Sequence, residues 1–345
     1  MTQELKDKTL DELEQLVATL GQKKYLAGYI FSFIHQKRIT DILQISPLSK
    51  SFREKLVGAG CTICRLVKVR TLLDPDGTLK YFFELPDGKR IETVVLTDDG
   101  RKTVCLSTQA GCAMNCAFCA TGKLALSRNL TAAEIISQLN AVEDDNHKIN
   151  NLVYMGMGEP LENYDAVVRS VRILNHPKAE NIGVRHLTIS TCGIPPGIER
   201  LADEAVHPRL AVSLNAPSDS LRTRLMPINK KYPIASVVKA VRTYQLKTNR
   251  RVTFEYVLIK GLNDKTQHAR MLAKLLAGLK FNVNLIEYNP HPGCKFIGSD
   301  KDVIRRFAAN LEAGGIETVI RYRRGQKIKA ACGQLGADLV SRGTG

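Results

Sequence analysis

The sequence has no long hydrophobic run, although 44% of its 345 residues are hydrophobic. A membrane-spanning helix needs about 20 consecutive apolar residues, and no stretch approaches that length. The first eight residues also lack an apolar signal region. From these absences we expect a cytoplasmic protein that does not cross a membrane. The hydrophobic content suits one large domain with a smaller one beside it.

The cysteines and the charged residues exclude further classes of protein. Nine cysteines, an odd number that is partly clustered, do not suit a secreted disulfide framework. Acidic residues are scarce: 34 Asp and Glu oppose 50 Lys and Arg, which gives a net charge of +16. This excess favours a polyanionic partner, because each neutralised phosphate releases counterions. A basic enzyme without such a partner is the alternative.

Three cysteines lie within eight residues, with the spacing C-x3-C-x2-C: Cys112, Cys116 and Cys119. Flanking Gly111 and Gly122, with polar Asn115 inside, predict a loop. Thiolates are soft ligands that suit iron–sulfur clusters, zinc and copper(I). Three cysteines can hold three irons of a [4Fe–4S] cluster and leave the fourth open for a small molecule. Zinc would need a fourth ligand, yet residues 120–146 contain no His or Cys; zinc with distant ligands, or cysteines that only pack, are the alternatives.

Hydrophobic periodicity predicts three kinds of structure along the chain. Helical spacing appears at 10–20, 25–37 and 49–56, in a segment rich in Lys and Arg: Lys23, Lys24, Lys37, Arg38, Lys50, Arg53 and Lys55. Short runs of branched and aromatic residues at 67–72, 81–85, 91–96 and 103–107, separated by Asp-Gly pairs, predict β-hairpins. Cys61 and Cys64 are interpreted as packing residues. No internal repeat or low-complexity segment is found.

From the cysteine loop onward, strands alternate with helices. Strands are expected at 151–155, 186–191, 210–214, 252–258 and 283–288, and helices at 131–142, 164–174, 196–204, 234–247 and 266–279. Together with the strand at Thr103 they make six βα units, which predicts an α/β fold with a partial (β/α)6 barrel. In such folds the chemistry is found at the C-terminal ends of the strands.

The segment Met155-Gly-Met-Gly-Glu-Pro-Leu-Glu-Asn follows one expected strand. Its glycines let the backbone approach a ligand closely, and Glu159 can accept hydrogen bonds from an ammonium group. The dinucleotide pattern G-x-G-x-x-G is incomplete, because Leu161 stands where the third glycine would fall. A tight structural turn is the alternative. Later strands also end in small polar residues, at 187–191, 212–216 and 288–292.

Phe118, just before the last cysteine of the loop, completes the signature of radical S-adenosylmethionine (SAM) enzymes. Two segments resemble the RlmN and Cfr family of RNA adenine methyltransferases: Cys105-Leu-Ser-Thr-Gln-Ala-Gly-Cys-Ala-Met-Asn-Cys-Ala-Phe-Cys-Ala-Thr-Gly and, after it, Asn129-Leu-Thr-Ala-Ala-Glu-Ile. The resemblance is strong over residues 92–335 and loose before them. It implies four parts: a helical accessory domain that contacts RNA (1–64), a β-rich extension (65–104), a radical SAM core (105–320) and a basic C-terminal segment (321–345). For the first part, a solvated helical cap is the alternative.

The resemblance also implies roles for individual residues. Cys112, Cys116 and Cys119 would hold the [4Fe–4S] cluster, and the SAM contacts would be Gly158, Glu159, Ser190, Ser213, Leu214, Asn215 and Asn289. The family often has His where Asn215 stands, but both side chains can hydrogen-bond. Ala330-Ala-Cys-Gly-Gln-Leu matches the methyl-carrier motif, so Cys332 would become S-methylcysteine. Cys105 matches the second catalytic cysteine and Glu92 the catalytic base. Basic residues beside Cys332 would suit an RNA backbone, with a solvated surface as the alternative: Arg321, Arg323, Arg324, Lys327 and Lys329.

The family's scheme uses two SAM molecules per turnover. One methylates Cys332, and the reduced cluster cleaves the other to a 5′-deoxyadenosyl radical. That radical removes hydrogen from the methyl group, and the carbon radical adds to the adenine ring. Glu92 then takes the ring proton, and Cys105 attacks the sulfur of Cys332 to release the product and leave a disulfide.

The resemblance implies 2-methyladenosine in the peptidyl-transferase region of 23S rRNA, and in tRNA beside the anticodon. The expected electron donor is a flavodoxin or a ferredoxin, and the expected state is a monomer. Methylation at C8, as in Cfr, is the first alternative; Pro160 favours RlmN, because Cfr proteins tend to lose it. A non-catalytic RNA-binding protein with a structural metal is a more distant one, and it would need neither Cys105, Cys332 nor Glu92.

Overall fold

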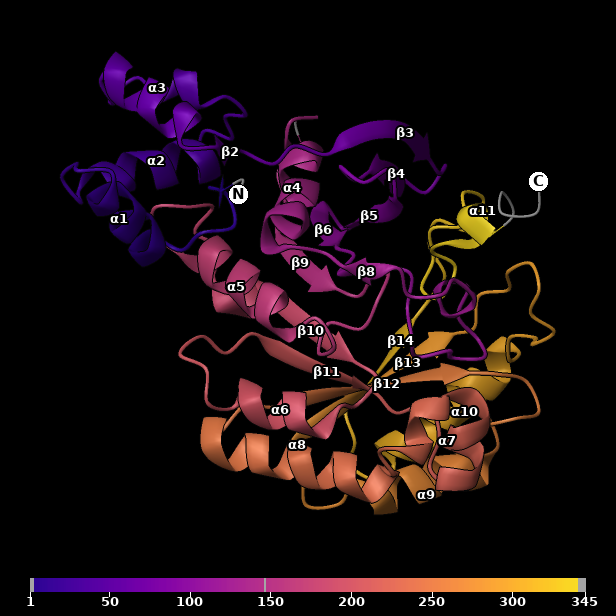
Figure 1. Cartoon of the computed structure of the whole chain (residues 1–345). Coiled ribbons are helices and arrows are strands. Elements are labelled where there is room, and N and C mark those ends of the chain that lie inside the picture. Colours follow the sequence, from indigo (N-terminus) through magenta and orange to yellow (C-terminus); the bar gives the residue numbers. More distant parts are fainter. Residues whose placement is uncertain (1–2, 146, 341–345) are drawn as a thin grey trace.

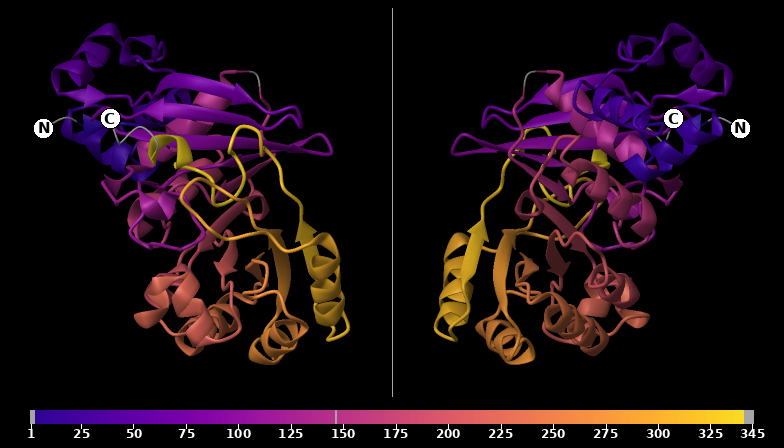
Figure 2. Two further views of the ribbon diagram at one scale, coloured as in Figure 1. Left: turned by 90° about the vertical axis from the view of Figure 1, so that its right-hand side faces the viewer. Right: turned by 90° about the vertical axis from the view of Figure 1, so that its left-hand side faces the viewer.

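The computed structural model describes residues 3–145 and 147–340. A single ten-stranded sheet runs through the molecule in the order β14-β13-β12-β11-β10-β9-β6-β5-β4-β3 (Figure 1). The first part of the chain forms small helices at one end of the molecule. The chain after β14 runs back toward strands β3 to β6, which are antiparallel (Figure 2). Within the described part of the chain, no helix is long and apolar enough to cross a membrane.

The barrel half of the sheet has seven parallel strands. They are β6 (Arg101–Cys105), β9 (Asn151–Tyr154), β10 (Leu187–Thr191), β11 (Arg209–Ser213), β12 (Val252–Leu258), β13 (Phe281–Glu287) and β14 (Thr318–Arg321). The helices between them are α4 (Ala132–Glu143), α5 (Tyr164–Asn175), α6 (Pro195–Leu201), α7 (Asp219–Leu225), α8 (Ile234–Thr248), α9 (Thr266–Leu275) and α10 (Lys301–Glu312). The predicted α/β barrel of six βα units is confirmed. The sequence analysis missed β14, α7 and α10.

Alternation along β12 separates the two faces of the barrel wall. Phe254 and Tyr256 are fully buried, and the ring of Tyr256 packs against Phe307 of α10 with ring centroids 5.3 Å apart. Glu255, the residue between them, points the other way, because successive side chains of a strand alternate. Glu255 thus accepts a hydrogen bond from Asn284 of β13 at 2.9 Å on the face away from the helices. The helix-facing side is apolar, and the inside of the barrel is polar.

The antiparallel half of the sheet is a meander of β3 (Val67–Leu73), β4 (Leu79–Glu84), β5 (Arg90–Asp98) and β6. The last turn places Asp99 at φ 47° and Gly100 at φ 72°, the left-handed pair that a tight hairpin requires. A two-stranded pair, β7 (Gln109–Ala110) and β8 (Arg128–Asn129), brackets the cysteine loop. The predicted hairpins are therefore present, and they lead directly into that loop.

The N-terminal helices are α1 (Leu10–Thr19), α2 (Leu26–His35) and α3 (Lys50–Gly58), with β1 (Gln3–Glu4) paired to β2 (Cys61–Thr62). Thr9 and Glu12 form a capping box that begins α1. Arg38, one of the basic residues of this segment, forms ion pairs with Glu143 (3.1 Å) and Asp144 (3.2 Å) at the end of α4. Short 3-10 turns and the last helix complete the chain: η1 (Ile42–Gln44), η2 (Thr121–Lys123), η3 (Val184–His186), η4 (Pro227–Lys230) and α11 (Ala337–Val340).

His35 is an unpartnered titratable group in the core of these helices. It is 1% exposed, and neither ring nitrogen has a hydrogen-bond partner among the described residues. Burial lowers its pKa to about 3, and the charges of Lys6 and His176 act in the same direction. An unfolded histidine titrates near pH 6.5, so below that pH the unfolded chain binds a proton that the folded chain does not.

Stability should therefore fall as the pH is lowered from 6.5. We expect His35 alone to remove about 1.4 kcal/mol of unfolding free energy per pH unit between pH 6 and pH 4. Urea unfolding at pH 7 and pH 5 measures this, and His35→Leu should show a smaller loss than the wild type. Ile34→Val removes no titrating group and should cost about 1 kcal/mol at both pH values. Equal losses for His35→Leu and wild type would contradict the prediction.

Candidate active site

The cysteine loop is held by backbone contacts that its glycines allow. Gly111 has φ 86°, and a Cβ there would lie 2.1 Å from the carbonyl oxygen of Ala125. A Cβ on Gly122 would lie 3.0 Å from the backbone nitrogen and oxygen of Cys116. Asn115 adopts φ 51°, a left-handed conformation that asparagine tolerates. The predicted loop is present, and its shape depends on these residues.

The three loop cysteines suit an iron–sulfur cluster better than a single metal ion. All nine cysteines are free, and burial raises the pKa of Cys112 to about 12 and also raises those of Cys116 and Cys119. A bound metal would offset this cost of forming thiolates. Among the described residues, no group of three or more His, Cys, Asp or Glu side chains is placed to hold a metal ion. In a [4Fe–4S] cluster each cysteine binds a different iron, so the thiolates need not converge.

Glu159 lies in the loop between β9 and α5 and is 3% exposed. Its carboxylate accepts hydrogen bonds from the backbone of Leu161 (3.0 Å) and Cys192 (2.7 Å), and its own N–H donates to Gln109 Oε1 at 2.8 Å. Burial raises its pKa, whereas these backbone donors lower it. Each carboxylate oxygen has a second lone pair, so an ammonium group can still be received.

Gly158 should be difficult to replace. Its φ is +102°, and a Cβ there would lie 2.6 Å from Cβ of Gln109. We expect Gly158→Ala to cost more than about 2 kcal/mol of unfolding free energy, because strain and overlap add. Gly58→Ala, which meets no heavy atom within 4 Å in α3, should be neutral or slightly stabilising. Thermal unfolding compares the two variants, and equal melting temperatures would contradict the prediction.

The other predicted SAM contacts lie at successive strand ends. Ser190 is in β10, Ser213 ends β11, Leu214 and Asn215 follow it, and Asn289 follows β13. Asn215 is already engaged, since its Oδ1 accepts from Val257 N–H at 2.8 Å and its Nδ2 lies 3.2 Å from the sulfur of Met226. Asn289 donates to the carbonyl of Cys332 at 3.1 Å, and its buried Oδ1 has no hydrogen-bond partner within the described residues. This unpaired acceptor fits a bound ligand with an N–H or O–H group.

The chain after β14 crosses to the cysteine loop and carries Cys332 there. The N–H of Ala120 donates to the carbonyl of Gly333 at 2.7 Å, and Thr121 Oγ1 donates to the carbonyl of Leu335 at 2.6 Å. The N–H of Gly336 donates to Oε2 of Glu92 at 3.0 Å. The C-terminal segment therefore lies between the loop cysteines and the antiparallel strands.

Glu92 of β5 is fully buried beside a lysine that the sequence analysis did not single out. Lys80 of β4 lies 2.8 Å from Oε2 of Glu92 and 3.1 Å from Asp338, and it is also fully buried. Burial raises the pKa of Glu92, and the charge of Lys80 lowers it. Oε1 of Glu92 has no hydrogen-bond partner among the described residues. The sequence did contain a signal for this pair, because Lys80 interrupts the apolar run that precedes Glu92.

Cys105 and Cys332 are electrostatic neighbours. Cys105 is 7% exposed, and burial together with the charge of Cys332 raises its pKa. It pairs with Val94 across the strands, which places it on the same face of the sheet as Glu92. Cys332 is exposed, yet desolvation by the surrounding protein raises its pKa to about 11; the charges of Glu255 and Cys119 contribute to this rise, and the charge of Arg321 opposes it.

Known proteins resemble this chain over almost its whole length. A model of the Radical SAM superfamily matches residues 106–272, and one of the ribosomal RNA large subunit methyltransferase N-terminal domain matches residues 3–61. A protein of Geobacillus kaustophilus (strain HTA426) named "Probable dual-specificity RNA methyltransferase RlmN" is 44% identical over 333 residues, which cover 95% of this chain and 91% of that protein. The chain belongs to the RlmN family.

Two further relatives agree with this membership. A protein of Staphylococcus aureus (strain JH9) has the same name and is 44% identical over 331 residues, which cover 95% of this chain and 91% of that protein. The crystal structure of a radical SAM methyltransferase from Sphaerobacter thermophilus superposes with a TM-score of 0.91 at 44% identity, covering 97% of this chain and 99% of that one. The resemblance found in the sequence is confirmed: this is a radical SAM methyltransferase, and SAM and a [4Fe–4S] cluster are the cofactors of its family.

Three of the basic residues near Cys332 in the sequence form ion pairs within this RlmN-family protein. Arg323 pairs with Glu287 at 3.0 Å, Arg324 pairs with Asp98, and Lys329 pairs with Asp338 at 2.8 Å. The first two ion pairs fasten the C-terminal segment to the sheet, and the third lies within that segment. The role of the five basic residues in RNA binding stays a prediction.

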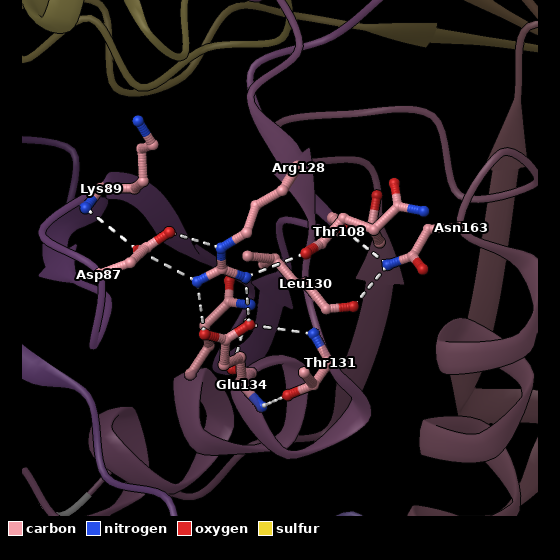
Figure 3. A network of polar contacts seen from close by, with 10 residues as sticks. Asp87, Lys89, Thr108, Arg128, Leu130, Thr131, Glu134 and Asn163 are labelled. Atoms are coloured by element: carbon pink, nitrogen blue, oxygen red, sulfur yellow. Dashed lines mark hydrogen bonds and ion pairs between the residues drawn. The ribbon is translucent and has the colours of Figure 1, made fainter.

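A second polar network fixes the chain on either side of the cysteine loop (Figure 3). Arg128 bridges Asp87 (2.7 Å) in the hairpin before β5 and Glu134 (2.8 Å) in the first turn of α4, and it holds the pKa of Asp87 at about 2. Asn163 donates to the carbonyls of Thr108 (2.8 Å) and Leu130 (2.7 Å). The loop that carries Glu159 is thus tied to both ends of the cysteine loop.

Proposed function

We propose that this protein methylates C2 of an adenine in the peptidyl-transferase region of 23S rRNA and of an adenine beside the tRNA anticodon, with Cys332 as the methyl carrier. The position of Cys332 carries the proposal. Its carbonyl is held by Asn289, the next carbonyl by the cysteine loop at Ala120, and the chain four residues on by Glu92. The relatives are named as probable dual-specificity RNA methyltransferases, which supports an RNA substrate.

The cofactors have a defined place in this proposal. Cys112, Cys116 and Cys119 would hold the cluster, which when bound supplies the electron that cleaves SAM. Glu159 would receive the ammonium group of SAM, and the unpaired Oδ1 of Asn289 would accept a further hydrogen bond. Two SAM molecules are used per turnover, one to methylate Cys332 and one as the radical source.

The chain's own residues then complete the transfer. Glu92 accepts the proton that leaves the methylated ring carbon; its raised pKa makes it a stronger base, and Lys80 keeps it ionised. After radical addition and loss of the ring proton, one electron remains in excess, and the cluster, when bound, would accept it. The thiolate of Cys105 attacks the sulfur of Cys332, so the bond between that sulfur and the product carbon breaks. The carbon keeps the bonding electron pair and takes up a proton to become the methyl group. A disulfide between Cys105 and Cys332 remains, and a two-electron reductant reopens it. A flavodoxin or ferredoxin would supply the electron for SAM cleavage.

The division of the chain into four parts, 1–64, 65–104, 105–320 and 321–345, belongs to the same proposal. The N-terminal helices would contact the RNA, because Lys23, Lys24 and Tyr25 are exposed there and Tyr25 offers a ring for a base to stack on. The target adenine must leave its stack to reach Cys332. We further propose that the enzyme acts as a monomer in the reducing cytoplasm.

Nucleoside mass spectrometry tests the reaction. Protein reconstituted anaerobically with iron and sulfide receives SAM, reductant and unmethylated 23S RNA, and the digest is compared with 2-methyl- and 8-methyladenosine standards. We expect 2-methyladenosine from the wild type and from Cys61→Ala, and none from Cys332→Ala. An 8-methyl product would move the enzyme to Cfr-type chemistry. SAM cleavage without any methyladenosine would refute the substrate and leave the radical chemistry in place.

A further inference from the structure

Arg222 in α7 is a buried cation that the chemistry above does not use. It is 0% exposed, the largest side chain among the fully buried ones. Within the described part of the chain, no carboxylate lies at ion-pair distance from its guanidinium. Arginine is almost never fully buried unless it is paired, because removing a charge from water is costly. The burial of this arginine in the core therefore indicates that its side chain has a specific role.

The guanidinium of Arg222 joins the ends of two neighbouring barrel strands. Its Nε donates to the carbonyl of Leu214 (3.2 Å), just after β11, and its Nη2 donates to the carbonyl of Cys192, just after β10. Its Nη1 donates to Asn229 Oδ1 (2.8 Å) and the carbonyl of Tyr232 (3.3 Å) beyond α7. The rigid fork of an arginine can hold several carbonyls in a fixed relation, which a lysine cannot.

Two of these carbonyls, those of Leu214 and Cys192, belong to segments proposed to hold a cofactor. Leu214 is a predicted SAM contact, and the N–H of Cys192 donates to Oε2 of Glu159 at 2.7 Å. One turn along α7, the carbonyl of Leu225 accepts from the N–H of Ala117 in the cysteine loop at 2.8 Å. Arg222 is thus one hydrogen bond away from each of the two segments proposed to bind SAM, one after β10 and one after β11. It lies on α7, the helix that also hydrogen-bonds to the cysteine loop.

The titratable groups that face Arg222 are the buried thiols of Cys192 and Cys116, and Asp219 at the start of α7. Burial keeps both thiols protonated by raising their pKa, so only metal binding would give Cys116 a negative charge. With Cys116 bound to the cluster as a thiolate, Arg222 would be a fixed cation within electrostatic range of it, on the helix whose Leu225 carbonyl binds the cysteine loop. Reduction adds negative charge to the cluster, and a nearby positive charge in a dry interior stabilises the reduced form.

We propose that Arg222 is a positioning residue that fixes the Cys192 and Leu214 carbonyls for SAM binding, and that its charge favours reduction of the cluster. The inference rests on the proposed cofactor site. It assigns to a residue of the barrel wall a function that none of the predicted site residues supplies.

Two variants separate the hydrogen bonds from the charge. Arg222→Gln removes the charge and most of the donors, whereas Arg222→Lys keeps the charge without the fork. Both are reconstituted anaerobically; the SAM dissociation constant is measured by calorimetry, and the midpoint potential by redox titration followed by electron paramagnetic resonance. We expect SAM affinity to fall about tenfold or more in both variants, since hydrogen bonds to charged groups are worth that much. The potential should become more negative in Arg222→Gln and stay near the wild-type value in Arg222→Lys.

The control is Leu221→Ala, a cavity in the same helix. It should lower the melting temperature while the potential and the SAM affinity stay at the wild-type values. A folded Arg222→Gln protein with wild-type affinity and potential would overturn the inference. If that variant does not fold, wild-type SAM affinity in Arg222→Lys overturns the positioning role. Wild-type protein that forms no cluster or binds no SAM would refute the proposed function itself, which is a separate outcome.

Discussion

Replacing Cys105 by alanine is expected to leave RNA covalently attached to Cys332. In the proposed chemistry, the methylated adenine stays bonded to the Cys332 sulfur until a second thiolate attacks that sulfur. Cys105 is the candidate for this attack, because it is buried close enough to Cys332 for the two charges to repel. Without its thiol, release stops after the carbon–carbon bond has formed. We expect product formation to fall to background while a protein–RNA adduct accumulates.

Denaturing electrophoresis after an anaerobic reaction detects the adduct, and mass spectrometry after digestion locates it. The RNA fragment should map to the peptide that contains Cys332. The double variant Cys105→Ala/Cys332→Ala should give no adduct, and Cys61→Ala should turn over like the wild type. Normal release of methyladenosine by Cys105→Ala would show that Cys105 is not the attacking thiol.

Glu92→Gln is expected to lower the rate of methylation by about 10²- to 10⁴-fold, the usual contribution of a general base. The amide keeps the size of the side chain but cannot accept the ring proton. In the wild type we expect Oε1 to accept it, because this buried atom has no hydrogen-bond partner among the described residues. Single-turnover methylation of RNA measures the loss. Glu84→Gln, which changes a carboxylate on the neighbouring strand β4, should keep at least half of the wild-type rate. A wild-type rate in Glu92→Gln would remove Glu92 from the mechanism.

The pH dependence gives a second test of Glu92 as the base. A base works only when ionised, so activity should be lost as the pH falls through the folded-state pKa of Glu92. Burial has raised that pKa above its ordinary value, and Lys80 lowers it. Lys80→Met should therefore raise it further and move the acid limb of the pH–rate profile to higher pH. An unchanged acid limb in Lys80→Met would show that the limb belongs to another group.

Much of this molecule was predictable from local sequence, because its signals act over a few residues. The period of apolar residues indicated six βα units, and the Asp-Gly pairs indicated the hairpins before the cysteine loop. The spacing C-x3-C-x2-C, with a glycine on either side, predicted the loop itself. Helix α10 was missed although Ile304, Phe307, Ala308 and Leu311 follow a helical period. Strand β14 is only four residues long at the edge of the sheet, which gives little signal.

The site residues outside the loop needed either the family resemblance or the fold. Glu92 and Gly336 are 244 residues apart in sequence and meet at 3.0 Å, and no spacing rule could join them. The fold alone pairs Lys80 with Glu92 and uses Arg324 to fasten the C-terminal segment.

The sequence by itself determined the elements, the cluster loop and the class of chemistry, because hydrogen-bond patterns and ligand spacing are local. The tertiary structure decided which charged residues form ion pairs that hold segments of the chain together and which face the site. It brought Cys332 within electrostatic range of Cys105, and it joined Arg222 to the ends of two strands by hydrogen bonds. Ion pairs and buried charges depend on which distant loops meet, and that is settled only when the barrel and its C-terminal segment pack together.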